Sequence, residues 1–143
     1  MKNRAATWVH LIFATIVVLA VPVQVYLIAS FAMGAGQSAL DAHEFTGGLI
    51  IHGSEVIVFL SSLVAFWRFW RWIAWSLFLP VLGTVQIALA DAGDSGWVRG
   101  FHGLGALLVF LLAAFLAYND ARLLGLIGRP ATAPAPPPPP PPA

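Results

Sequence analysis

Residues 6–33 read ATWVHLIFATIVVLAVPVQVYLIASFAM, an apolar stretch without a lysine, arginine, aspartate or glutamate. It is longer than the roughly 20 residues that a helix needs to cross the hydrocarbon core of a bilayer. Three further apolar stretches follow at 42–66, 73–90 and 101–124. Because a segment in lipid must satisfy its own backbone hydrogen bonds, such stretches form helices. The sequence therefore predicts an all-α integral membrane protein with four spans.

The composition supports a membrane protein and narrows the chemistry. Of the 143 residues, 59% are hydrophobic and 9% are charged, whereas about a quarter of the residues of a soluble domain are charged. The absence of cysteine excludes disulfides, thiolate metal sites and covalent haem attachment, and leaves histidine as the strong nitrogen ligand. A net charge of +1 gives no reason to expect nucleic acid as a partner. The expected partner is the lipid bilayer.

The loop charges predict the orientation of the spans. Basic residues precede the first span, separate the second from the third and follow the fourth: Lys2, Arg4, Arg68, Arg71, Arg122 and Arg129. The other two loops contain Asp41, Asp91 and Asp94 and a single arginine, Arg99. By the positive-inside rule, both termini are expected in the cytoplasm and the protein in the cell inner (plasma) membrane. We expect an up-down-up-down four-helix bundle over residues 1–128.

The C-terminal segment 129–143 differs from the rest of the chain. Pro136 to Pro142 form an unbroken proline run, which favours a polyproline II conformation. We interpret this proline-rich tail as a disordered spacer. The alternative is a ligand for an aromatic groove of a cytoplasmic protein.

An internal repeat links the spans in pairs. Val23-Gln24-Val25-Tyr26-Leu27 precedes a loop and His43, and Val85-Gln86-Ile87-Ala88-Leu89 precedes a loop and His102. A small residue, Gly47 or Ala106, follows each histidine by four positions and lies on the same helix face. A small side chain there lets a flat ligand or another helix approach closely. The pattern predicts a bundle built from a duplicated helix pair.

His43 and His102 are the main candidate ligands. Both lie near the outer ends of spans that are diagonal in the predicted bundle, so their side chains can meet across its core. They are candidate axial ligands of a haem b, and two histidines would leave no open position on the iron, which suits electron transfer. Alternatively, both are interfacial residues that bond loop carbonyls, or they bind a metal ion. Gln24 and Gln86 are expected to hydrogen-bond between helices, or to orient a ligand.

His52 and Glu55 form a second polar pair, three residues apart on one helix. His52 lies nine residues beyond His43, about half a turn out of phase in an α-helix, so the two histidines are not expected to share a face. The pair is either mutually satisfied and packed against a neighbouring helix, or a proton or quinone site. His10 is expected at the inner interface, and no other acidic residue is expected deep in a span.

The arrangement of Gln24, His43, Gln86 and His102 over four spans resembles one four-helix half of haem A synthase. It also resembles a group of small four-span membrane proteins common in actinobacteria. The resemblance covers roughly residues 23–109. It implies that His43 and His102 are the axial ligands of haem. Only one four-helix unit is present, and the longer charged loop motifs of the synthase have no clear counterpart.

Three functions are open from the sequence. The first is a b-type haem-binding module that passes single electrons to a redox partner. The alternative is a non-catalytic accessory subunit of a larger membrane complex, and the third is a transporter built on the repeat. The sequence has no nucleophile–base pair, phosphate-binding loop or zinc spacing, so we do not expect the chain to be an enzyme by itself.

Overall fold

The computed structural model describes residues 3–91 and 96–128, and within them the chain is helical with short connections. The elements are α1 (Arg4–Ala32), α2 (Gln37–Phe45), the π-helical stretch η1 (Thr46–Ile51), α3 (His52–Ala65), α4 (Trp70–Asp91) and α5 (Gly96–Leu124). Because α2, η1 and α3 follow one another without a break, they form a single span, Gln37–Ala65. The described residues thus contain four helices long and apolar enough to cross a membrane, which confirms the all-α prediction.

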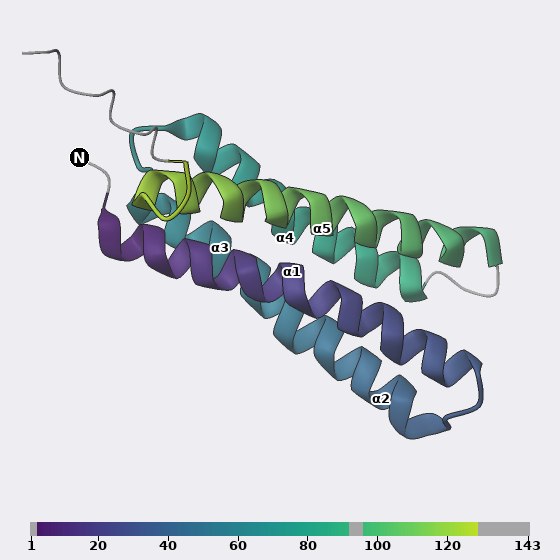
Figure 1. Cartoon of the computed structure of the whole chain (residues 1–143). Helices are drawn as coiled ribbons and strands as arrows, with labels where there is room; N and C mark the ends of the chain where they lie inside the picture. The colour runs from purple at the N-terminus through teal and green to yellow at the C-terminus, as the bar shows by residue number, and fades with distance from the viewer. Residues whose placement is uncertain (1–2, 92–95, 129–143) are drawn as a thin grey trace, which may run out of the picture.

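The four spans form two hairpins that pack side by side (Figure 1). Helix α1 packs against α3 and α5, and α4 packs against the same two helices. The helices therefore surround the core in the order α1, α3, α4, α5, with α3 and α5 diagonal to each other as predicted. The tail 129–143, including its proline run, lies outside the described residues.

The helices are longer than the apolar stretches from which they were predicted. The second helix begins at Gln37, before the expected span 42–66, and α4 begins at Trp70, before the expected span 73–90. Likewise, α5 begins at Gly96 rather than near Phe101. Hydropathy marks the part of a helix that suits hydrocarbon, whereas hydrogen bonding continues into the headgroup region, where polar side chains are tolerated.

A glycine turn ends α1. Gly34 adopts a φ of 95°, a conformation that glycine enters without a Cβ penalty. Its N–H bonds the carbonyl of Phe31, and the N–H of Ala35 bonds the carbonyl of Ser30. This pair of bonds is the Schellman motif, which satisfies carbonyls at the end of a helix. It lets the chain reverse within a few residues and keeps the first hairpin tight.

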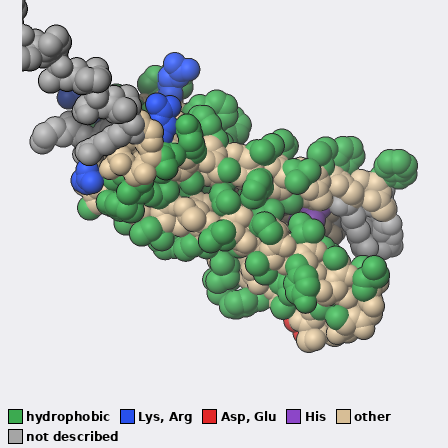
Figure 2. Space-filling view, viewed as in Figure 1, with side chains coloured by type: hydrophobic (Ala, Val, Ile, Leu, Met, Phe, Trp, Pro, Cys, Tyr) green, Lys and Arg blue, Asp and Glu red, His purple; other side chains and the backbone are tan. Residues whose placement is uncertain are grey.

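The middle of the bundle is a dry apolar layer. Its fully enclosed members come from all four spans: Ala14, Val17, Val58, Leu79, Ala113 and Leu116. The outer surface is also mainly hydrophobic, as the green side chains in Figure 2 show. Since lipid is as apolar as this surface, packing rather than the hydrophobic effect must hold the helices together.

Basic side chains gather at one end of the molecule. Arg4, Arg68, Arg71 and Arg122 belong to the end that carries the start of α1 and the α3–α4 turn, where Figure 2 shows arginine side chains in blue. The opposite end, where α1 ends, α2 begins, α4 ends and α5 begins, carries Asp41, Glu44 and Asp91. We call these the terminal end and the loop end.

Leu79→Ala should destabilise the bundle by about 1–3 kcal/mol. The substitution leaves a cavity in the apolar layer, but the transfer contribution that enlarges such losses in soluble proteins is missing in lipid. Leu77→Ala on the same helix removes a side chain that is 44% exposed and should change stability by less than about 0.5 kcal/mol. Thermal unfolding in detergent, followed by circular dichroism, compares the two. Equal losses would contradict this account of the core.

Candidate functional site

His43 is fixed to α1 by a reciprocal pair of hydrogen bonds. Its Nδ1 lies 3.2 Å from the backbone carbonyl oxygen of Gln24, and the side-chain amide of Gln24 donates to the backbone carbonyl of His43 at 2.8 Å. The two residues therefore hold each other across the first hairpin. The expected role of Gln24 as a hydrogen-bonding residue between helices is confirmed.

The second hairpin repeats this arrangement with different residues. The Nδ1 atom of His102 lies 2.9 Å from the backbone carbonyl oxygen of Gln86, and the Gln86 amide donates to the backbone carbonyl of His102 at 2.8 Å. The same groups of the same residue types thus meet twice, on α1 with α2 and on α4 with α5. This correspondence in three dimensions is stronger evidence of duplication than the short sequence match.

These bonds determine which ring nitrogen is available to a ligand. A carbonyl oxygen can only accept, so the Nδ1 atom of each ring carries the hydrogen. In a neutral imidazole the other nitrogen, Nε2, then has a free lone pair. Histidines that bind metals commonly donate their second N–H to a backbone carbonyl in this way. Nε2 is therefore the nitrogen of each ring that is available to bind a metal.

The two rings lie next to each other across the two hairpins. The ring centroids of His43 and His102 are 6.3 Å apart and the ring planes are inclined by 64°. A metal–imidazole bond of about 2.0 Å, with about 1.1 Å from nitrogen to ring centre, places the centroids of two trans ligands about 6 Å apart. The observed separation therefore agrees with two imidazoles on opposite sides of one metal centre.

An apolar cavity opens around the imidazoles. It has a volume of about 190 Å³ between the hairpins, is partly open to the outside, and all four spans contribute to its walls. His43, His102, Gln24 and Gln86 line it. A histidine side chain is visible from outside in the space-filling view, between the two hairpins (Figure 2). The cavity is mainly apolar, as sites for organic cofactors usually are.

Small residues make room for the two glutamines. A Cβ on Gly47 would lie 3.0 Å from Nε2 of Gln24, and a Cβ on Gly105 would lie 2.5 Å from Oε1 of Gln86. Gly47 therefore corresponds to Gly105, rather than to Ala106 as the spacing suggested. The first copy has one more residue after its histidine because it includes the π-helical stretch, which accommodates an extra residue. Gly47 and Ala106 both line the cavity, as expected.

His52 and Glu55 line the same cavity, contrary to the expectation that His52 faces away from His43. That expectation assumed an unbroken α-helix. The π-helical stretch between the two histidines turns less per residue, so it brings His52 round to the cavity. Nδ1 of His52 lies 2.9 Å from Oε2 of Glu55. The carboxylate is fully buried, and its Oε1 has no hydrogen-bond partner among the described residues.

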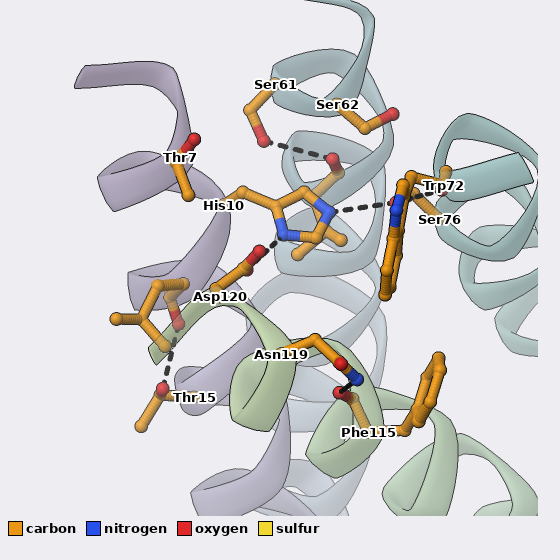
Figure 3. A network of polar contacts seen from close by, with 12 residues as sticks. Thr7, His10, Thr15, Ser61, Ser62, Trp72, Ser76, Phe115, Asn119 and Asp120 are labelled. Atoms are coloured by element: carbon orange, nitrogen blue, oxygen red, sulfur yellow. Dashed lines mark hydrogen bonds and ion pairs between the residues drawn. The ribbon is translucent and has the colours of Figure 1, made fainter. Parts of the chain in front are cut away.

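A second buried polar cluster lies toward the terminal end. His10 is fully buried, with Nδ1 2.5 Å from Oδ2 of Asp120 and Nε2 2.8 Å from Oγ of Ser76. Figure 3 shows the His10 ring between these two partners, which come from α5 and α4. His10 is thus enclosed by the bundle rather than exposed at an interface. Asp120 is a second buried acidic residue, and it lies four residues before the end of α5.

The His10 cluster has the order of groups of a hydrolytic triad but not its setting. Ser76 donates its hydroxyl hydrogen to the backbone carbonyl of Trp72 at 2.9 Å, and its side chain is fully buried. None of the three residues lines a described cavity. A nucleophile must reach its substrate, so we assign this cluster to helix packing. The only signal of this cluster in the sequence is that the first and last apolar spans each contain an ionisable residue, His10 and Asp120.

Comparison with known proteins gives no match to a family model, to a curated protein or to a solved structure. The functional argument therefore depends on the geometry of the chain itself.

Gly83→Ala should disturb the cavity more than an alanine substitution at a glycine that has open space around it. A Cβ on Gly83 would lie 1.8 Å from Oε2 of Glu55 and 2.7 Å from Nδ1 of His52. The pair must move, at a cost of about 1–3 kcal/mol in stability. Gly53→Ala is the matched control, because its Cβ would meet nothing within 4 Å and alanine favours a helix. Thermal unfolding of both variants tests this; a Gly83→Ala protein as stable as the wild type would contradict the close approach.

Proposed function

We propose that this chain is an integral membrane b-type haem protein that passes single electrons. The observation that carries the proposal is the pair of Nδ1-bonded imidazoles, His43 and His102, whose centroids are 6.3 Å apart in an apolar cavity. Each feature has a role in haem binding: the bonded Nδ1 fixes the ring, the free Nε2 provides the ligand, and the separation suits two axial positions.

The residues around the imidazoles fit a flat, mainly apolar group. Gly47, Gly103 and Ala106 line the cavity close in sequence to the two histidines and present little bulk. Haem bound there would supply a one-electron iron couple, and two histidine ligands would leave no position for oxygen. The chain itself supplies the fixed rings and an apolar enclosure that limits the access of water.

A bare metal ion fits the site less well. Within residues 3–91 and 96–128, no group of three or more His, Asp or Glu side chains is placed to hold a metal ion. Structural zinc sites use four protein ligands and catalytic sites three. Two imidazoles at the edge of a cavity much larger than an ion instead favour an organic group between them.

The charge distribution supports the proposed placement in the membrane. The terminal end carries Arg4, Arg68, Arg71 and Arg122, and the loop end carries Asp41, Glu44 and Asp91. By the positive-inside rule, both termini then lie in the cytoplasm and the candidate haem site lies toward the outer face of the plasma membrane. A redox partner would therefore approach from the outer side or within the membrane.

His43→Ala and His102→Ala should each abolish the reduced-minus-oxidised haem spectrum of protein purified from haem-replete cells. Either substitution removes one of two axial ligands. Phe45→Ala and Phe101→Ala are matched controls next to each histidine; both phenylalanines are 59% exposed, and these variants should keep the spectrum. Absorption spectroscopy with pyridine-haemochrome quantification measures the haem content.

A folded but colourless wild-type protein would contradict the proposal. The alternative, an accessory subunit of a larger membrane complex, would then gain weight. Native mass spectrometry after gentle solubilisation distinguishes the two, because an accessory subunit should leave the membrane with partner chains. A coloured protein without partner chains would count against that alternative.

A further inference from the structure

The cavity that holds the two imidazoles has a single acidic group in its wall. Glu55 lies 12 positions beyond His43 on the same span and has no exposed surface. One carboxylate oxygen bonds His52, and the other is enclosed without a partner in the described part of the chain. Gly83 on α4 provides the space, since any Cβ there would collide with the carboxylate. The structure therefore keeps room for a group that is costly to bury.

Comparison of the two halves shows that packing does not require this acid. Counted from Gly47 and Gly105, the residue that corresponds to Glu55 is Ala113. Counted from Gln24 and Gln86, the residue that corresponds to Gly83 is Val21. Ala113 and Val21 both belong to the apolar core. The α1–α5 interface thus uses an ordinary alanine and valine where the α3–α4 interface has a carboxylate and a glycine.

The cavity has few charges with which to balance an added electron. Its ionisable lining residues are His43, His102, His52 and Glu55, and no lysine or arginine is among the lining residues. Helices α1 and α4, which pack against α3, contribute Gln24, Gln86 and apolar side chains to the lining. In surroundings of low dielectric constant an uncompensated negative charge is costly. A proton bound near the electron would remove most of that cost.

Within the described residues, an apolar layer separates Glu55 from the terminal end of the bundle. Toward the terminal end, the next buried polar side chain on the same helix is Ser62, seven residues away, or about 10 Å along the axis. Val58, Leu79 and Leu116 fill the space between, and all are at most 1% exposed. This apolar layer separates Glu55 from the cluster of His10 and Asp120. The cavity is open to the outside on its own side of that layer.

We propose that the Glu55–His52 pair is a redox-linked proton site that exchanges its proton through the cavity. The proposal rests on the proposed haem function. When a one-electron reductant delivers an electron to the site, the Glu55 carboxylate binds one proton from water at the loop end; when the electron leaves, the proton returns. Electron and proton charges then balance within the cavity, and Asp120 takes no part.

A potentiometric titration with one-electron mediators, repeated across the neutral pH range, tests the coupling in the full-length haem-loaded protein. Uptake of one proton with each electron lowers the midpoint potential as the pH rises, by up to about 59 mV per pH unit. The wild type should show such a slope. Glu55→Gln keeps the size of the side chain but cannot exchange the proton, so its slope should fall close to zero while its haem spectrum remains.

Asp120→Asn is the matched control, because Asp120 is also a buried carboxyl but lies beyond the apolar layer. It should keep the wild-type slope, and loss of the slope there would overturn the route through the cavity. A pH-independent wild type, or a full slope in Glu55→Gln, would overturn the proton site itself.

If Glu55→Gln does not fold, redox-difference infrared spectroscopy of the wild type tests whether a carboxyl group takes up the proton. The C=O stretch of a protonated carboxyl should appear on reduction, and its absence would overturn the proposal. A colourless wild type would end both this proposal and the haem function, whereas a coloured protein with a flat potential would end only this one.

Discussion

The reciprocal hydrogen bonds between a glutamine and a histidine are the constraint on which the loop end of this protein depends. Each pair joins the two helices of one hairpin and uses the backbone carbonyl of each residue. In hydrocarbon these polar groups have no water to bond, so the pairing stabilises the hairpin and holds each ring in place at once. The imidazoles are thereby oriented by the fold before any ligand arrives.

The duplicated hairpin explains both the symmetry and the asymmetry of the bundle. At the loop end, the two copies present equivalent glutamines, histidines and glycines around a shared cavity. Toward the terminal end the copies differ: Glu55 and Gly83 lie at one interface, and Ala113 and Val21 lie at the other. The repeat places two matching imidazoles at the loop end, and a difference between its copies places a single carboxyl beside them. A symmetrical pair of acids would have placed two carboxyls in the same dry core.

The fold could be predicted from the sequence, whereas the site could be predicted only in part. Span length and hydropathy were enough for four helices, and the repeated Gln and His were enough to pair His43 with His102. The orientation of His52 could not be predicted, because a change from α to π winding leaves no clear mark in hydropathy. The contact between His10 and Asp120 could not be predicted either, because the two residues are 110 positions apart and meet only through tertiary packing. Helix ends were missed because lipid preference and hydrogen bonding end at different residues.

The π-helical stretch Thr46–Ile51 sets the rotational phase of everything that follows it in its span. If the same residues wound as a regular α-helix, α3 would turn by roughly 100° about its axis. His43 would keep its place beside Gln24, while Glu55 would swing out of the cavity toward a neighbouring helix or lipid. Loss of one residue from the stretch would instead restore regular winding and leave Glu55 facing the cavity, because the second copy, which is one residue shorter, has Ala113 at the equivalent position.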